Sequence, residues 1–191
     1  MKIRLTTLVI AFLLFFLTDA FGQTERRESM FRPVVGGGFL SGGSFSPNQF
    51  NYLSGGVARL GLQTKFLEKH NAAILLGINQ FDRDIFYPLM LQFRWVNNPD
   101  KALGFLTSFG YSPGKGEFEI ESDDYELEGG FYIELGAQWK FDLGNQWAMM
   151  PSISVSRQRA ILEYNPEFSS SYEVEDDRIA VVFAINLQLG R

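Results

Sequence analysis

The feature that most constrains this chain is a period-two alternation of residue types that recurs from residue 33 to residue 189. In the segment 87–95, every second position holds a large apolar residue: Tyr87, Leu89, Leu91, Phe93 and Trp95. Such alternation is typical of β-strands, because successive side chains of a strand point to opposite faces of the sheet. No segment after residue 22 has the period of a long helix, so the sequence predicts an all-β protein.

Eight segments carry this alternation: 33–44, 52–66, 71–79, 87–95, 103–111, 131–141, 147–158 and 179–189. The second, fourth and sixth connections between them are all short, whereas the fifth (112–130) and seventh (159–178) are long. Outer-membrane barrels combine short periplasmic turns with longer outer loops. The sequence therefore predicts an eight-stranded antiparallel up-and-down transmembrane β-barrel with both chain ends in the periplasm.

The first residues have the composition of a secretory signal peptide. Lys2 and Arg4 precede the apolar run 5–17, and small residues around position 22 offer a cleavage site. We expect a signal peptide at 1–22, a periplasmic N-terminal tail at 23–32 and an outer-membrane barrel domain at 33–191. The chain has no cysteine, which excludes disulfides and thiolate metal sites.

The tryptophans indicate which face of the barrel meets lipid. Trp95, Trp139 and Trp147 all lie close to short turns and share the parity of the large apolar residues. Together with Tyr87 they predict an aromatic girdle, since amphipathic rings favour the membrane interface. The opposite face is small or polar, as at Gly104, Ser108 and Ser154. A soluble lipocalin-like periplasmic binding barrel is an alternative with the apolar face inward, but it does not account for the tryptophans.

One strand pair resembles a known family. The proline-containing apolar strand Tyr87–Phe93 is followed by the segment Gly104–Gly110, which has glycines on its inner face. This arrangement, within the span 33–189, resembles the small outer-membrane β-barrel domain family of Gram-negative bacteria, often described as porin-like. The resemblance implies a barrel in the cell outer membrane and says little about activity.

Several charged residues have the parity of the barrel interior. Arg59 and Glu134 lie at similar distances from their periplasmic turns, so we expect them to pair across the lumen, because a lone buried charge is costly. Lys65, Arg94 and Lys140 lie nearer the periplasmic end and complete the predicted lumen charge network.

The two long connections are acidic. The fifth contains the predicted acidic outer loop: Glu117, Glu119, Glu121, Asp123, Asp124, Glu126 and Glu128. Alternation within 116–130 predicts that the strands continue above the membrane as a β-ribbon. We expect outer-membrane lipid and lipopolysaccharide as partners, with a basic protein or divalent cations at the acidic loops. The net charge of −5 gives no reason to expect nucleic acid.

No constellation of residues indicates catalysis, a metal site or a cofactor. The one histidine, His70, is placed in a short turn, and Ser152, Ser154 and Ser156 have no base near them in sequence. We therefore expect a non-enzymatic outer-membrane barrel with a filled lumen that displays acidic extracellular loops, because eight strands leave room only for side chains. A narrow conduit or a small-molecule-binding barrel is the competing hypothesis.

Overall fold

The computed structural model describes residues 31–46, 49–66, 70–82, 84–96, 102–115, 117–120, 123–144, 146–164 and 172–189. The predicted signal peptide lies outside these residues, as does nearly all of the predicted N-terminal tail. Among the described residues the strands are β1 (Phe31–Ser46), β2 (Gln49–Phe66), β3 (His70–Phe81), β4 (Asp84–Phe86), β5 (Leu89–Trp95), β6 (Leu103–Ser112), β7 (Gly114–Lys115), β8 (Glu117–Ile120), β9 (Asp123–Trp139), β10 (Phe141–Gly144), β11 (Trp147–Tyr164), β12 (Tyr172–Glu175) and β13 (Asp177–Leu189).

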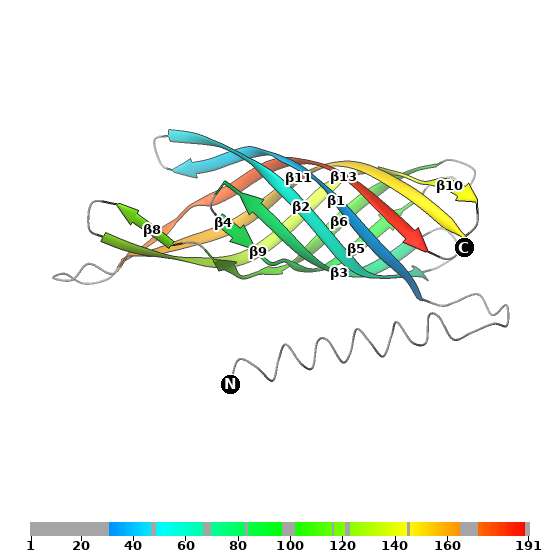
Figure 1. The fold of residues 1–191 in the computed structure, drawn as a ribbon, viewed down its shortest axis with the longest axis horizontal. Coiled ribbons are helices and arrows are strands. Elements are labelled where there is room, and N and C mark those ends of the chain that lie inside the picture. The colour runs from blue at the N-terminus through cyan, green and yellow to red at the C-terminus, as the bar shows by residue number, and fades with distance from the viewer. Residues whose placement is uncertain are drawn as a thin grey trace, which may run out of the picture. The chain divides into compact units, whose positions relative to one another are not determined.

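Eight of these strands form a closed antiparallel wall. Its order is β1, β2, β3, β5, β6, β9, β11 and β13, and the pairing of β13 with β1 closes the ring. The strands run obliquely along the barrel (Figure 1), as closure of a sheet requires. The predicted eight-stranded barrel is therefore confirmed.

The remaining strands prolong those of the wall. β4 precedes β5, β7 and β8 follow β6, β10 follows β9, and β12 precedes β13. The chain leaves the ladder at Tyr87 and Pro88, between β4 and β5, where the proline carbonyl still accepts a hydrogen bond from the Gly77 amide at 2.8 Å. Since proline lacks an N–H, it fits such an interruption better than the middle of a ladder.

Several predicted boundaries differ from the structure, and two of these differences matter for the fold. β1 begins at Phe31, two residues before the predicted start of the barrel domain. The seventh connection is not a plain loop, because β11 continues to Tyr164 and β12 pairs with it. Both differences arise because pairing to a neighbouring strand extends a segment beyond its own alternation signal.

The pattern of buried and exposed residue types is the reverse of that in a soluble protein. On β9, Glu134 is fully buried while the adjacent Leu135 is 55% exposed. The same contrast recurs around the wall, where the buried polar residues include Arg59, Gln63, Asn79, Gln92, Ser108, Gln138, Ser156, Asn186 and Gln188. A soluble barrel buries its apolar side chains and exposes its charges. An apolar outer belt is instead the surface of a barrel inserted in lipid, so the lipocalin-like alternative does not fit.

Apolar side chains also lie inside the barrel, in two clusters. The larger one lies toward the end that carries the long connections, and includes Leu40, Val57, Phe81, Phe86, Leu127 and Val182. The second comprises Val34, Ala73, Leu75, Met90, Tyr132 and Met150. The interior thus alternates between apolar clusters and polar groups along its length. No helix in the described part of the chain is long and apolar enough to cross a membrane.

Candidate functional site

The interior charge pair joins strands that are not neighbours in the wall. Arg59 on β2 and Glu134 on β9 are fully buried, and Arg59 Nη2 lies 2.9 Å from Glu134 Oε2. The predicted pairing of these two residues is therefore confirmed. Tyr132 donates a hydrogen bond to the same carboxylate oxygen at 2.9 Å, and the Ser154 hydroxyl donates to the other oxygen. Glu134 thus accepts contacts from a cation and two hydroxyls at a fully buried position.

A glycine makes room for this arrangement. A Cβ atom added at Gly136 would lie 2.3 Å from the Ile153 carbonyl oxygen and 2.4 Å from Ser154 Cβ. Real Cβ atoms do not approach other heavy atoms so closely, so a larger residue would displace the strand that carries Ser154. Close approach of β9 and β11 therefore requires glycine at this position.

A second buried charge cluster lies on the side of the interior where the long connections emerge. Arg178 Nη2 lies 2.7 Å from Asp84 Oδ2, and Arg178 also contacts Asp176. All three residues are buried. Burial raises the pKa of the Asp84 carboxyl, and the hydrogen bond from Arg178 opposes that rise. The cluster ties β4, at the end of a short hairpin, to β13.

Sequence reasoning missed this second cluster. Asp84 and Arg178 are 94 residues apart and were assigned to connections rather than to strands. The inward parity of Arg178 relative to Ala180 and Val182 was a signal that could have placed it. Its partner could not be read from the sequence, because the pairing depends on where the hairpin around Asp82 ends.

The other predicted interior cations do not join the Arg59 and Glu134 pair. Arg94 is buried and donates from Nη2 to the Ala102 carbonyl oxygen at 2.5 Å. Lys140 lies 3.8 Å from Asp142, and Lys65 is exposed and forms no ion pair with any described residue. The structure therefore contains the central pair and separate cations near the short turns, rather than one connected network.

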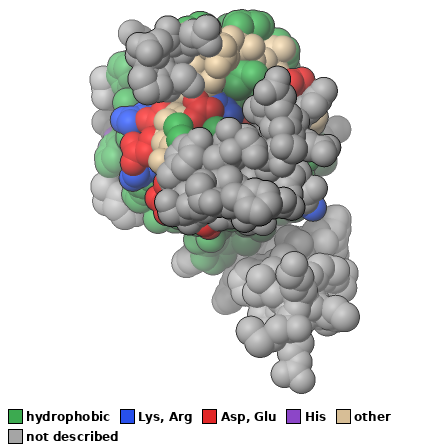
Figure 2. All heavy atoms as spheres, turned by 90° about the vertical axis from the view of Figure 1, so that its left-hand side faces the viewer, with side chains coloured by type: hydrophobic (Ala, Val, Ile, Leu, Met, Phe, Trp, Pro, Cys, Tyr) green, Lys and Arg blue, Asp and Glu red, His purple; other side chains and the backbone are tan. Residues whose placement is uncertain are grey.

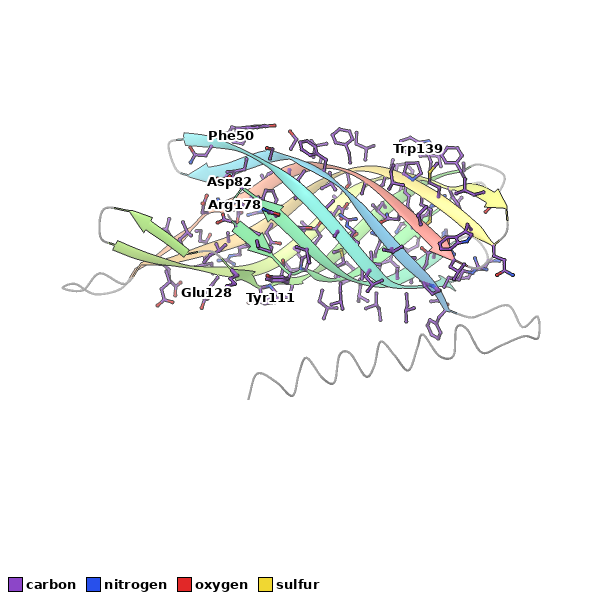
Figure 3. All side chains as sticks on the ribbon, viewed as in Figure 1. Phe50, Asp82, Tyr111, Glu128, Trp139 and Arg178 are labelled. Carbon is purple, nitrogen blue, oxygen red and sulfur yellow. The ribbon has the colours of Figure 1, made fainter. Side chains whose placement is uncertain are left out.

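Aromatic residues mark both ends of the apolar belt. Trp95 and Trp147 are each 41% exposed, and Trp139 is half-buried, near the short turns. Figure 3 shows Trp139 toward one end of the barrel and Tyr111 and Phe50 toward the other. Tyr87 precedes the same strand that ends at Trp95, and its amide donates to the Pro113 carbonyl at 2.9 Å. Tyr87 therefore lies near the opposite interface from the tryptophans.

An open sheet continues the wall beyond the barrel on the side of the long connections. β8 pairs with β9 from Glu117 opposite Glu126 to Ile120 opposite Asp123, so the strand pairing expected within 116–130 is present. The ends of β9 and β11 also pair, and β11 pairs with β12. These four segments, 117–120, 123–129, 160–164 and 172–175, are called the extracellular sheet below, after the location that we propose for them. Its edge strand β8 lies at the opposite end of the barrel from β10 and the short turns beside it (Figure 1).

The extracellular sheet has an apolar and an acidic side. Leu127 is buried and Leu162, opposite it in the ladder, packs against the larger apolar cluster. Glu128, Glu173 and Glu175 are exposed. Figure 2 looks onto this end of the molecule and shows acidic and basic side chains gathered there. The backbones of Glu117, Glu119, Asp123, Asp124 and Glu126 belong to the sheet, whereas Glu121 lies outside the described residues.

The structure shows the contacts of His70 and Ser154, a histidine and a serine that were considered above for catalysis. His70 is the first residue of β3 rather than a turn residue, and its ring lies 4.9 Å from the ring of Trp95. Its Nδ1 accepts a hydrogen bond from the Val96 amide at 3.4 Å. Ser154 does have a carboxylate beside it, which the sequence did not predict, but that carboxylate is already paired with Arg59. His70 and Ser154 thus contact other partners and not each other.

Comparison with known proteins supports the fold. No protein-family model matches the sequence, and no protein of curated function is significantly similar to it. Among solved structures, the chain is similar to the crystal structure of Neisserial surface protein A (NspA), with a TM-score of 0.57, 5% identity, and coverage of 85% of this chain and 98% of that one. It is also similar to the solid-state NMR structure of the outer-membrane protein AlkL in lipid bilayers, with a TM-score of 0.52, 10% identity, and coverage of 88% and 95%.

These likenesses show the fold, which is that of the small eight-stranded outer-membrane β-barrels. The apolar outer belt and the polar interior supply the physical reason for the location. A closed barrel leaves no unpaired backbone in the lipid, and an apolar wall is stable there. The protein is accordingly an outer-membrane β-barrel.

Proposed function

We propose that the protein is a non-enzymatic barrel whose lumen is filled by its own side chains and whose role is to hold the extracellular sheet outside the cell. One observation carries the proposal: the interior side chains of all eight wall strands include residues with little or no exposed surface. They include Val34 and Leu40 on β1 and every second residue from Met150 to Gln158 on β11. The Arg59 and Glu134 pair lies across this interior.

The composition of the extracellular sheet supports an interaction role. Its segments contain nine carboxylates and no lysine or arginine. Such a one-sided charge favours divalent cations or a basic protein as partner, and steers either toward the sheet at low salt. We propose these partners together with lipopolysaccharide and outer-membrane lipid, which surround the barrel.

A specific observation favours the second candidate function, a narrow conduit or small-molecule-binding barrel. Several buried polar atoms inside the barrel have no partner among the described residues, including Nε and Nη1 of Arg59 and both amide atoms of Asn186 and Gln188. Buried polar groups usually find a partner, and water is a common one. A chain of waters between these groups would hydrate the interior.

Single-channel recording in planar lipid bilayers separates the two functions. The purified protein should migrate differently on gels before and after boiling, which shows that the barrel is folded in the sample. A filled lumen predicts no stable conductance steps from such a sample. Reproducible steps that scale with salt concentration would contradict the filled lumen and support the conduit.

A further inference from the structure

The outer wall of the barrel carries charged residues at one place where the surrounding surface is apolar. Arg157 on β11 shares the outward parity of Ile153 and Val155, which are 40% and 53% exposed, and its side chain is 64% exposed. A charged side chain facing lipid is costly at the middle of the bilayer and is tolerated near its surface. Whether the bilayer tolerates Arg157 therefore depends on the height of this residue on the barrel wall.

That height corresponds to the outer surface of the lipid. Trp147, at the short-turn interface, and Arg157 are ten positions apart on the same continuous strand. Ten residues of strand span about 33 Å, and a tilt of about 40° reduces this to about 25 Å along the barrel axis. This equals the height of the apolar band of an outer-membrane barrel, about 25 Å. Arg157 thus lies where the phosphates of the outer leaflet are found.

A groove of about 290 Å³ opens beside this arginine. It is lined by Arg157, Glu175, Asp177 and Ile179, from β11, β12 and β13. Farther along β13 toward the short turns, Val181 and Phe183 are exposed and continue an apolar surface. A polar groove joined to an apolar wall fits an amphiphile whose headgroup enters the groove while its acyl chains follow the wall.

Two ion pairs lie at the groove, Arg157 with Asp177 and Arg159 with Glu175, and the first of them leaves two polar atoms over. Arg157 contacts Oδ2 of Asp177 through Nε at 2.7 Å and through Nη2. Its Nη1 takes no part in these contacts. The other oxygen of Asp177, Oδ1, is buried and has no partner among the described residues. A ligand that binds both side chains must bring an anion to Arg157 and a hydrogen-bond donor or a cation to Asp177.

We propose that this groove binds the phosphorylated headgroup of lipopolysaccharide in the outer leaflet. Arg157 binds a headgroup phosphate, and Asp177 binds a divalent cation that neutralises that phosphate. Guanidinium groups suit phosphate because they form charge-assisted hydrogen bonds in a fixed plane. Divalent cations bind carboxylate and phosphate oxygens together. The inference rests on the proposed function in one respect, since it requires the groove to face the outer leaflet.

Binding can be measured with the full chain refolded in nanodiscs of phosphatidylcholine. Lipopolysaccharide is titrated in the presence of Mg²⁺, and the temperature of unfolding is followed by tryptophan fluorescence. We expect lipopolysaccharide to raise the unfolding temperature of the wild type, and enzymatically dephosphorylated lipopolysaccharide or EDTA to abolish most of that rise. Phosphatidylglycerol and inorganic phosphate should each produce a much smaller rise. Equal rises with phosphatidylglycerol or with the dephosphorylated lipid would overturn the assignment to lipopolysaccharide.

Two variants locate the site. Arg157→Gln should weaken lipopolysaccharide binding about tenfold or more, the size expected for a lost charge-assisted hydrogen bond. The matched control is Lys115→Gln, which removes an exposed cation in β7 near the same end of the barrel and should leave binding unchanged. Asp177→Asn should remove the dependence on Mg²⁺. Unchanged binding in Arg157→Gln, or an equal loss in Lys115→Gln, would refute the site.

The proposed function has a separate readout in the same samples. Heat-modifiability on gels and fractionation of the expressed protein with the outer membrane test the barrel and its location. A folded, correctly fractionated barrel without a response to lipopolysaccharide would refute the groove alone. A protein that does not fractionate with the outer membrane would refute the premise of the proposed function.

Discussion

The central ion pair offers the sharpest test of how this barrel is stabilised. Glu134→Gln keeps the shape of the side chain and removes its charge. Arg59 and Glu134 are both fully buried, and Glu134 also accepts hydrogen bonds from Tyr132 and Ser154. The glutamine amide has one acceptor oxygen in place of two, so at least one of these donors loses its partner. Arg59 becomes a buried cation without a neutralising charge.

The expected loss follows from the burial of both partners. Removing one member of a fully buried pair typically costs about 3–5 kcal/mol, because the remaining charge is left without compensation. We expect Glu134→Gln to lower the free energy of unfolding by that amount. The measurement is urea-induced unfolding in phospholipid vesicles, followed by tryptophan fluorescence with gel mobility as a second probe. Coincident transitions from the two probes would justify a two-state treatment.

Two controls make this result interpretable. Glu128→Gln makes the same chemical change on the same strand at an exposed position, and should alter stability by less than about 0.5 kcal/mol. The double variant Arg59→Met with Glu134→Gln removes the orphaned cation and should recover most of the loss. If Glu134→Gln unfolds at the wild-type urea concentration, the ion pair does not stabilise the barrel and the reasoning fails.

The remaining predictions concern packing, depth and topology. Gly136→Ala should destabilise the barrel by about 1–3 kcal/mol, because the added Cβ would collide with β11. Gly56→Ala should cause no loss of stability, because its Cβ would lie 3.9 Å from the nearest heavy atom. Urea unfolding compares the two variants, and equal effects would contradict the packing argument. The depth of Trp95 and Trp147 can be measured by fluorescence quenching in variants that each retain one tryptophan. Lipids brominated near the headgroup should quench this fluorescence more than lipids brominated near the chain ends. Stronger quenching by the deep bromines would contradict an interfacial girdle. Protease added to intact cells should cleave within 116–130, since the extracellular sheet is expected outside; protection until the periplasm is released would reverse the topology.

The sequence by itself determined the wall of the barrel. Alternation placed eight strands, and the tryptophans at the short turns indicated that the apolar face meets lipid. Both inferences succeeded because the period of two residues is a property of each strand alone, independent of its neighbours. Even the pairing of Arg59 with Glu134 could be predicted, because strand height and the cost of a lone buried charge were sufficient.

Only the tertiary structure decided which other charges meet. Arg178 reaches Asp84 because closure of the ring brings β13 and the β3–β4 hairpin to the same end of the interior. The segments Ile161–Tyr164 and Tyr172–Glu175 lie within the predicted seventh connection, and each is too short to signal a strand without its partner. The groove beside Arg157 likewise depends on the register between β11 and β13, which sets Arg157 opposite Ile179 and within reach of Asp177. Register and closure couple residues far apart in the chain, and no local pattern contains that information.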